Sequence, residues 1–264
     1  MEKVAWDTET TGTDPGSRML SLAGILFDDE TGEVLERREW TVNPGMPIPP
    51  DAAKVNGFTD EAVKDSDNAG VVLREFFAWL PVRASLVAHY AQYDTGIITW
   101  EAARHGVAIP DDLAVTCTCA IAKQIGVTKR NSLDALVAHY GIQRCGEAHR
   151  AMSDADACMQ YFMLVKRAGL IESPVPWDAA GHDYRYTDQF PEPLTNLSEL
   201  VGAAAPLTFQ YEDNAGAKTE RAVTPYGWYL KDDALYFSGY CHLREERRTF
   251  RADRVQAIIE GVAS

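Results

Sequence analysis

The 264-residue sequence lacks the features that mark membrane, secreted and zinc-binding proteins. No apolar run approaches the roughly 20 residues that a membrane-spanning helix requires, and the first residues lack the basic and apolar halves of a signal peptide. Only five cysteines occur, with no Cys-x-x-Cys pair, which argues against a zinc site or a disulfide framework. We therefore expect a soluble, cytoplasmic protein with no membrane partner and no disulfide partner.

Basic residues are also scarce, since 25 Lys and Arg stand against 39 Asp and Glu and the net charge is −14. This balance argues against broad, charge-driven coating of nucleic acid, because such binding depends on basic side chains that displace counterions. It leaves room for an enzyme that grips a few nucleotides through bound metal. The length allows one large core or two smaller ones, and a change of pattern near residue 170 favours two.

The apolar pattern of the first 169 residues predicts a mixed α/β sheet flanked by helices. Three strands that follow one another along the chain should form an antiparallel meander, and a short, fully apolar strand should lie in the centre of the sheet. The expected strands cover residues 3–6, 20–27, 33–42, 85–89 and 113–116. The expected helices cover 71–80, 95–104, 132–141 and 151–166, and Thr59 is expected to cap a further helix.

The rest of the chain has a different pattern. Residues 170–198 interleave prolines with aromatics, which predicts an extended linker that docks through its rings. Residues 199–264 alternate with period two between turns, which predicts a small β-barrel closed by a short helix from Val255. The expected domains are thus 1–169 and 199–264, and we expect a chain ended after Gly169 to fold alone.

The first strand ends in a pair of acids, Asp7 and Glu9. Residues two apart on a strand project to the same face, so these two carboxylates should lie side by side. Their repulsion is relieved most cheaply by a hard divalent cation, and oxygen ligands suit magnesium or manganese better than zinc. The alternative is that Asp-x-Glu arises by chance in an acidic chain.

Two other segments end in acids where strands and a helix could converge. Asp94 follows the strand at 85–89, and Asp154 begins the helix at 151–166, with His149 in the turn before it. This set fits two-metal hydrolysis of a phosphodiester, in which ions roughly 3.5–4 Å apart stabilise the attacking and leaving oxygens while His149 takes a proton from water. Alternatively, the two aspartates serve only as a helix cap and a first-turn acid, and the histidine is a loop residue.

Three segments, at residues 7–12, 89–94 and 149–155, resemble the motifs of the DnaQ-like, DEDDh-type 3′–5′ exonucleases, with further echoes at 55–59 and 131–136. The resemblance implies an RNase H-like fold and two Mg²⁺ (or Mn²⁺) ions. It assigns the ions to Asp7, Glu9, Asp94 and Asp154, and the role of general base to His149.

The same resemblance implies release of nucleoside monophosphates from a 3′ end, with single-stranded DNA as the expected substrate. It places four residues near the terminal nucleotide: Thr8, Thr10, Thr11 and Tyr90. The chain departs from the family pattern at Tyr90, where Asn is common, at Asn56, where His is common, and at 114–116, which lacks an Asp. None of these is a metal ligand, so the departures bear on sugar and base preference.

Residues 207–257 resemble a WYL domain, whose name-giving tripeptide is present as Trp228-Tyr229-Leu230. The resemblance implies a small Sm-like or SH3-like barrel that binds or senses nucleic acid or a nucleotide in a basic pocket. The residues that offer phosphate contacts and a stacking face are Arg221, Tyr229, Arg247, Arg251 and Arg254. The alternative is that the apolar residues of this segment are core and that its arginines form surface ion pairs of little worth.

The leading hypothesis is therefore a metal-dependent 3′–5′ exonuclease with a WYL domain that binds or senses nucleic acid. One alternative is a 3′–5′ exoribonuclease. Another is a regulatory binding protein in which the exonuclease fold only holds a nucleic-acid end. The sequence leaves the oligomeric state open, a homodimer included.

Overall fold

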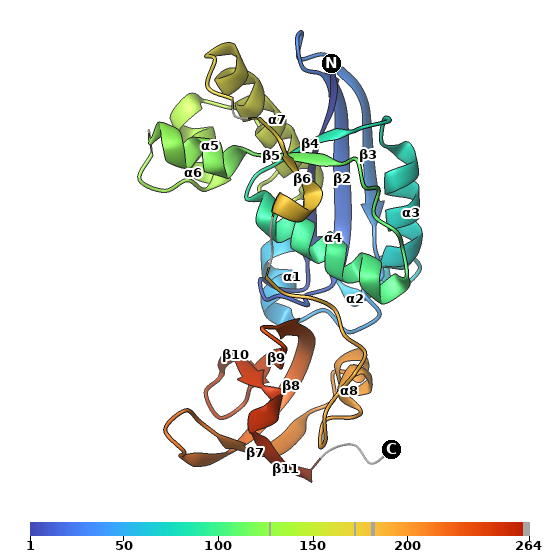
Figure 1. Ribbon diagram of the computed structural model, residues 1–264, viewed down its shortest axis with the longest axis vertical. Helices are drawn as coiled ribbons and strands as arrows, with labels where there is room; N and C mark the ends of the chain where they lie inside the picture. Colours follow the sequence, from blue (N-terminus) through green and yellow to red (C-terminus); the bar gives the residue numbers. More distant parts are fainter. Residues whose placement is uncertain (127, 172, 181–182, 261–264) are drawn as a thin grey trace.

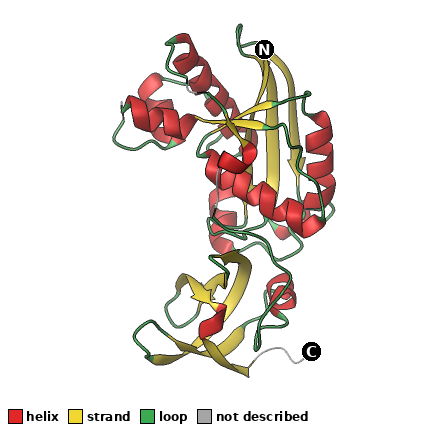
Figure 2. Ribbon diagram, in the orientation of Figure 1, coloured by secondary structure: helices red, strands yellow, loops and turns green. Residues whose placement is uncertain are grey.

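Two sheets organise the chain. The computed structural model describes residues 1–126, 128–171, 173–180 and 183–260, so the last four residues of the expected C-terminal domain lie outside the described part. A mixed six-stranded sheet has the order β3-β2-β1-β4-β5-β6, and a five-stranded antiparallel sheet has the order β10-β9-β8-β7-β11 (Figure 1). Helices gather around the first sheet and are few around the second (Figure 2). The predicted mixed α/β sheet flanked by helices, with a second β domain, is confirmed.

The first region carries most of the secondary structure. Its strands are β1 (Glu2–Thr10), β2 (Met19–Asp28), β3 (Val34–Thr41), β4 (Ser85–Ala88), β5 (Ala114–Cys117) and β6 (Val175–Pro176). Its helices are α1 (Pro50–Asn56), α2 (Asp60–Val63), α3 (Ala69–Trp79), α4 (Ala91–His105), α5 (Thr118–Ile125), α6 (Leu133–Tyr140) and α7 (Ala151–Arg167). The predicted strands and helices lie within a few residues of these bounds, whereas α1, α5 and β6 were not predicted.

The second region contains α8 (Leu197–Ala203) and the strands β7 (Leu207–Glu212), β8 (Lys218–Lys231), β9 (Ala234–Cys241), β10 (Glu246–Arg251) and β11 (Val255–Glu260). Within the described residues its edge strands β10 and β11 each pair with one neighbour, so the sheet is open and the prediction of a closed barrel is wrong. The predicted helix from Val255 is also wrong, because β11 pairs antiparallel with β7.

The alternation of side chains along β1 decides where the acids point. Val4 and Trp6 belong to the core under α3 and α4, whereas Ala5 belongs to the core under α7. The two helix layers cover opposite faces of the sheet (Figure 1). Because the side-chain period of a strand is two, Asp7 continues the face of Ala5 toward α7, and Thr8 continues the other face toward α4.

The two regions share buried side chains. Trp100 of α4 is 1% exposed and packs in the core of the second sheet, where its ring lies 5.6 Å from that of Trp228. Trp177, which follows β6, packs in the core of the first sheet and stacks on Trp6 at 5.7 Å. The segment predicted as a linker therefore contributes a strand and a core residue to the first region.

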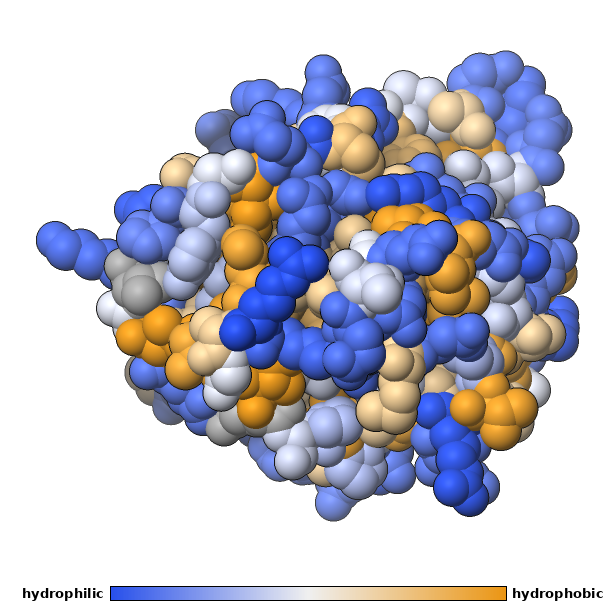
Figure 3. Space-filling view, turned by 90° about the horizontal axis from the view of Figure 1, so that it is seen from above, coloured by the Kyte–Doolittle hydropathy of each residue, from blue (hydrophilic) through white to orange (hydrophobic). Residues whose placement is uncertain are grey.

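The face of the molecule at the end that carries the N-terminus is largely hydrophilic (Figure 3). Seen from the end that carries the N-terminus, hydrophobic residues form patches separated by hydrophilic ones (Figure 3). Among the described residues, no helix combines the length and the apolar character needed to cross a membrane.

Candidate active site

Three carboxylates converge where β1 ends and α7 begins. Asp7 and Glu9 project from the same face of β1, and Asp154 lies in the first turn of α7. One carboxylate oxygen from each residue can be chosen so that all three lie within 4.8 Å of one another. The side chains that the sequence predicted to be metal ligands on these two elements are thus brought together.

Asp94 approaches the group from the other face of the sheet. It lies in the first turn of α4, and its Oδ1 accepts hydrogen bonds from the backbone nitrogen of Thr8 at 3.1 Å and from the Thr8 hydroxyl at 2.7 Å. Asp94 is 3% exposed and stands outside the close group of three, but its charge acts on both Asp7 and Glu9. The hydrogen bonds of Thr8 therefore connect the segment at residues 7–12 to the segment at residues 89–94.

Burial and mutual repulsion raise the pKa values of three of these acids, and nearby arginines offset the rise only in part. Burial, followed by the charges of Asp94 and Glu9, raises the pKa of Asp7 well above its ordinary range. Burial and then the charge of Asp94 raise the pKa of Glu9 to about 7, and burial raises the pKa of Asp94 itself to about 7. An all-oxygen donor set under mutual repulsion fits a hard divalent cation, which would stabilise the ionised forms.

The raised pKa values predict that the metal-free protein loses stability as pH rises from about 4 to about 7. Over this range the unfolded acids have lost their protons while the folded ones still hold them, so each pH step favours unfolding. In EDTA, the melting temperature should fall by several degrees between pH 5 and pH 8. Magnesium added at pH 8 should restore it. Thermal melting at both pH values, with and without metal, measures this.

A matched variant separates this effect from the general acidity of the chain. Glu9→Gln removes one of the titrating carboxylates and should flatten the pH dependence relative to the wild type. If the two proteins show parallel stability curves in EDTA, the acid cluster is not the source of the effect.

His149 lies in the turn before α7, as predicted from the sequence. Its φ is +58°, and its backbone nitrogen donates to Oδ2 of Asp154 at 3.2 Å, which fixes the turn against the acid cluster. The side chain is exposed and lines a pocket together with Glu9. An imidazole thus stands beside the carboxylates with access to solvent.

The pocket beside His149 has a volume of about 380 Å³. Thr8 and Thr10 line it, and the Thr10 hydroxyl donates to the Gly12 carbonyl at 2.6 Å. Thr11 is 1% exposed, and its hydroxyl accepts a hydrogen bond from the backbone of Arg18 at 2.9 Å. The first two threonines therefore face the pocket, while Thr11 shapes the loop that follows β1.

The family comparison agrees with this geometry. The RNase_T family model, described as Exonuclease, matches residues 4–162, and the WYL domain model matches residues 192–259. The chain belongs to the RNase_T exonuclease family. The DNA polymerase III subunit epsilon of Pasteurella multocida is 30% identical over 172 residues, which cover 62% of this chain and 67% of that protein. The corresponding subunit of Haemophilus influenzae is 32% identical over 178 residues, covering 62% and 66%.

Solved structures show the same fold. The nuclease domain of 3′hExo, a DEDDh family member bound to rAMP, has a TM-score of 0.59 at 14% identity and covers 66% of this chain and 97% of that one. Exonuclease I has a TM-score of 0.56 at 19% identity and covers 90% of this chain and 55% of that one. The chain is a DnaQ-like 3′–5′ exonuclease, a hydrolase, with a WYL domain at its C-terminal side.

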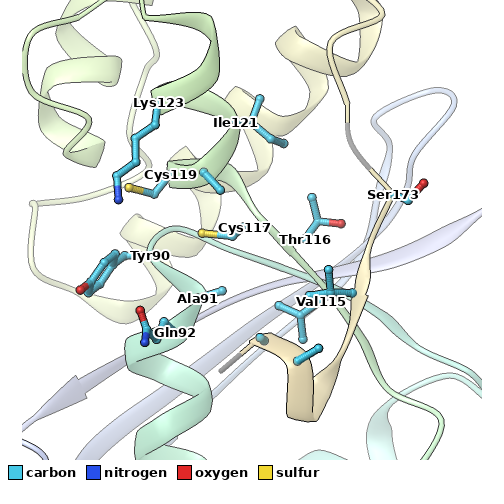
Figure 4. Close-up of a pocket in the computed structure, with 14 residues that line it drawn as sticks. Tyr90, Ala91, Gln92, Val115, Thr116, Cys117, Cys119, Ile121, Lys123 and Ser173 are labelled. Atoms are coloured by element: carbon cyan, nitrogen blue, oxygen red, sulfur yellow. The ribbon is translucent and has the colours of Figure 1, made fainter. Parts of the chain in front are cut away.

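In this exonuclease Tyr90 lies apart from the threonines. It lines a second pocket of about 270 Å³, with Gln92 and Lys123 beside it and Val115 and Ser173 across from it (Figure 4). The phenol ring is about half exposed, and the Lys123 ammonium lies 5.8 Å from its centre. The structure thus separates Tyr90 from the pocket that contains His149.

Several residues of the exonuclease site were missed from the sequence. Arg144 forms ion pairs with Asp154 and Asp134, so a partly buried cation already contacts the acid cluster. Arg150 donates to the Asn56 carbonyl at 2.8 Å, and its charge partly offsets the rise that burial causes in the pKa of Glu9. Arg144 pairs with acids ten residues before and after it, and Arg150 reaches Asn56, 94 residues away, so no local pattern marks either arginine.

The predicted WYL pocket is dispersed over the second sheet of the exonuclease. Tyr229 stacks on Tyr236 at 5.3 Å, and Arg251 lies 5.9 Å from the Tyr236 ring, so these three form a row across β8, β9 and β10. Arg251 also pairs with Asp253 on the same segment. The remaining predicted residues stand elsewhere: Arg221 opposite Phe209 of β7, Arg254 in a 3₁₀ turn before β11, and Arg247 against the nuclease domain.

Proposed function

We propose that this chain removes nucleoside monophosphates one at a time from the 3′ end of single-stranded DNA, using two Mg²⁺ or Mn²⁺ ions. The observation that carries the proposal is the convergence of Asp7, Glu9 and Asp154 within 4.8 Å, with His149 beside them. These residues come from two elements more than 130 residues apart in sequence. A surface cluster formed by general acidity would not combine burial, raised pKa values and an adjacent pocket.

The divalent ions would be held by four carboxylates: Asp7, Glu9, Asp94 and Asp154. When bound, they would stabilise charge on the attacking and leaving oxygens of the phosphodiester. The protein positions the ligands from both faces of the sheet, because Asp7 and Glu9 face α7 while Thr8 holds Asp94 from α4. This arrangement keeps the acids fixed before substrate arrives.

His149 is the proposed general base. Its backbone is fixed to Asp154, and its exposed imidazole can take a proton from the attacking water and pass it to solvent. The pocket lined by Thr8, Thr10 and His149 is the proposed site of the 3′-terminal nucleotide. The threonine side chains border the position where sugar and phosphate would lie.

Replacing His149 by alanine should lower kcat by about 10²- to 10⁴-fold, the range typical for removal of a general base. Metal binding should persist, because the variant keeps all four carboxylates. Single-turnover cleavage of a 5′-labelled strand measures the rate, and Mn²⁺ titration by calorimetry measures the metal. His139→Ala, on α6 beside Tyr140, is the matched control and should cleave normally. A loss below threefold in the His149 variant would remove it from the base role.

The substrate class is proposed from two relatives that are at least 30% identical, both of them DNA polymerase III epsilon subunits. Matched DNA and RNA oligonucleotides test it, and faster shortening of RNA would reverse the assignment to an exoribonuclease. The same relatives lead us to place the protein in the cytoplasm.

The WYL domain is proposed to bind or sense nucleic acid. Its support is the row of Tyr229, Tyr236 and Arg251, which combines ring faces with a guanidinium. The variant Arg251→Ala should bind single-stranded DNA more weakly than the wild type while it hydrolyses a dinucleotide at the same rate.

A further inference from the structure

Arg247 of β10 reaches across the domain boundary to the nuclease. Its Nε and Nη2 donate to the two carboxylate oxygens of Asp51, each at 3.0 Å, so the pair is bidentate. Its Nη1 donates to Asp14 at 3.1 Å, and Nη2 also donates to the backbone carbonyl of Thr11 at 3.1 Å. The guanidinium carbon lies 4.9 Å from the centre of the Tyr226 ring. One WYL-domain side chain thus contacts two separate elements of the nuclease.

The elements that Arg247 joins are the two walls of the pocket beside the catalytic acids. Gly12 and Thr13 of the loop after β1 form one wall, and Asp51 and Ala52 of α1 form the other. Arg247 lines the same pocket as His149 and Glu9. Its contacts span the gap between the walls, so its position sets their separation.

The donor count of Arg247 shows what it can do. A guanidinium has five N–H groups, and four of them are donated to Asp51, Asp14 and Thr11. Burial alone would raise the pKa of Asp51, but hydrogen bonds from Arg247 outweigh it and the pKa is lowered. The side chain is 16% exposed. It therefore has too few donors left for a bidentate phosphate contact. Its hydrogen bonds instead hold the loop after β1 against α1, and we call this set of contacts the clasp.

Close contacts of β8 with the loop after β1 surround this arginine contact. Gly16 has a φ of +79°, and a Cβ there would lie 2.1 Å from the Trp228 carbonyl oxygen, while a Cβ on Gly227 would lie 2.4 Å from the Gly16 carbonyl oxygen. Arg18 is 3% exposed, with its guanidinium 4.8 Å from the Trp100 ring and 4.9 Å from the Trp228 ring. The loop that follows the first catalytic motif is thus packed directly on the WYL tryptophan.

We propose that Arg247 is a positioning residue of the nuclease, which fixes the loop at residues 11–18 against α1 and so sets the width of the pocket for the 3′-terminal nucleotide. The expected change in KM rests on the proposed function. The WYL domain on this account completes the substrate site of the nuclease. Loosening the clasp weakens ground-state and transition-state binding alike, which raises KM and leaves kcat nearly unchanged.

The test uses full-length Arg247→Met and Arg247→Lys, with Arg248→Met as the matched control. Arg248 is the next residue, nearly half exposed, and donates to Glu246 of its own strand. Both Arg247 variants should raise KM for a 5′-labelled single strand about tenfold, the effect of losing one charge-assisted hydrogen bond, with kcat within threefold. The control should match the wild type. Lysine fails here because a point charge cannot make the bidentate contact.

Hydrogen exchange provides a readout that does not depend on catalysis. Backbone amides of residues 11–18 should exchange at least about tenfold faster in the Arg247 variants than in the wild type or the Arg248 control, while the amides of β1 exchange at an unchanged rate. An unchanged KM in an active enzyme, or an unchanged exchange rate in this loop, overturns the proposal. If the wild type releases no mononucleotide, the proposed function fails, and the exchange rates alone decide whether Arg247 fixes the loop.

Discussion

Asp7→Ala should abolish mononucleotide release, with kcat lowered by at least about 10³-fold, which corresponds to roughly 4 kcal/mol of transition-state stabilisation. The size follows from removing a ligand that serves the metal site at its centre, since bound metal supplies several kcal/mol to such a reaction. The neighbouring carboxylates of Glu9 and Asp154 occupy their own places in the group, so neither can replace the Asp7 carboxylate without moving. Initial rates on a 5′-labelled strand in saturating magnesium measure the loss.

The same variant should be at least as stable as the wild type in EDTA. In the wild type, the pKa of Asp7 is raised by burial and by the charges of Asp94 and Glu9. Above neutral pH the ionised Asp7 therefore lowers the free energy of unfolding, and alanine removes this penalty. Stabilisation with loss of activity is the pattern expected of a functional residue under strain. Glu61→Ala, at an exposed acid of α2, is the control and should change neither property. Activity that persists in Asp7→Ala would assign the hydrolysis to a contaminant.

A chain ended after Gly169 should fail to give a stably folded nuclease. The cut removes β6, which pairs with β5, and Trp177, which is 6% exposed, stacks on Trp6 and donates to the Thr99 hydroxyl at 3.0 Å. It also exposes Trp100, which is buried by the WYL domain. Loss of a buried tryptophan costs about 3–5 kcal/mol, and exposing a second large apolar side chain costs about 1.5–3 kcal/mol more. Together these costs are comparable to the stability of a typical domain, about 5–15 kcal/mol. The sequence-based expectation of independent folding is revised accordingly.

Two truncations separate these contributions. A chain ended after Ala180 keeps β6 and Trp177 but still exposes Trp100, so its melting temperature should lie between those of the full chain and of the chain ended after Gly169. Circular dichroism melts of the three proteins measure the order. A chain ended after Gly169 that melts cooperatively near the full-length temperature would show that neither tryptophan contact matters for the nuclease fold.

The sequence predicted those features of the site that local rules determine. The period of a strand placed Asp7 and Glu9 on one face, and the helix start placed Asp154 in a first turn, with His149 in the turn before it. These residues were candidates first because acids stand at the ends of strands and at a helix start, and the family motifs then assigned each one a role. The strands and helices of the first sheet followed from apolar periodicity.

The remaining features depend on contacts between distant segments. The bond from Thr8 that holds Asp94 follows from which face of β1 meets α4. The ion pairs of Arg144 and the clasp of Arg247 join residues that no local pattern relates. The open second sheet likewise depends on whether β10 and β11 meet, which their own sequences do not determine.

Acids from three segments, β1, α4 and α7, should jointly support metal-dependent hydrolysis at a 3′ end. Product sizing on one 5′-labelled DNA strand tests this, with wild-type protein stripped by EDTA and then titrated with Mn²⁺. We expect no cleavage without metal and, as metal is added, a ladder of labelled products that shorten by one nucleotide at a time, together with released mononucleotide. Cleavage that persists in EDTA, or a labelled mononucleotide as the first product, would contradict this expectation.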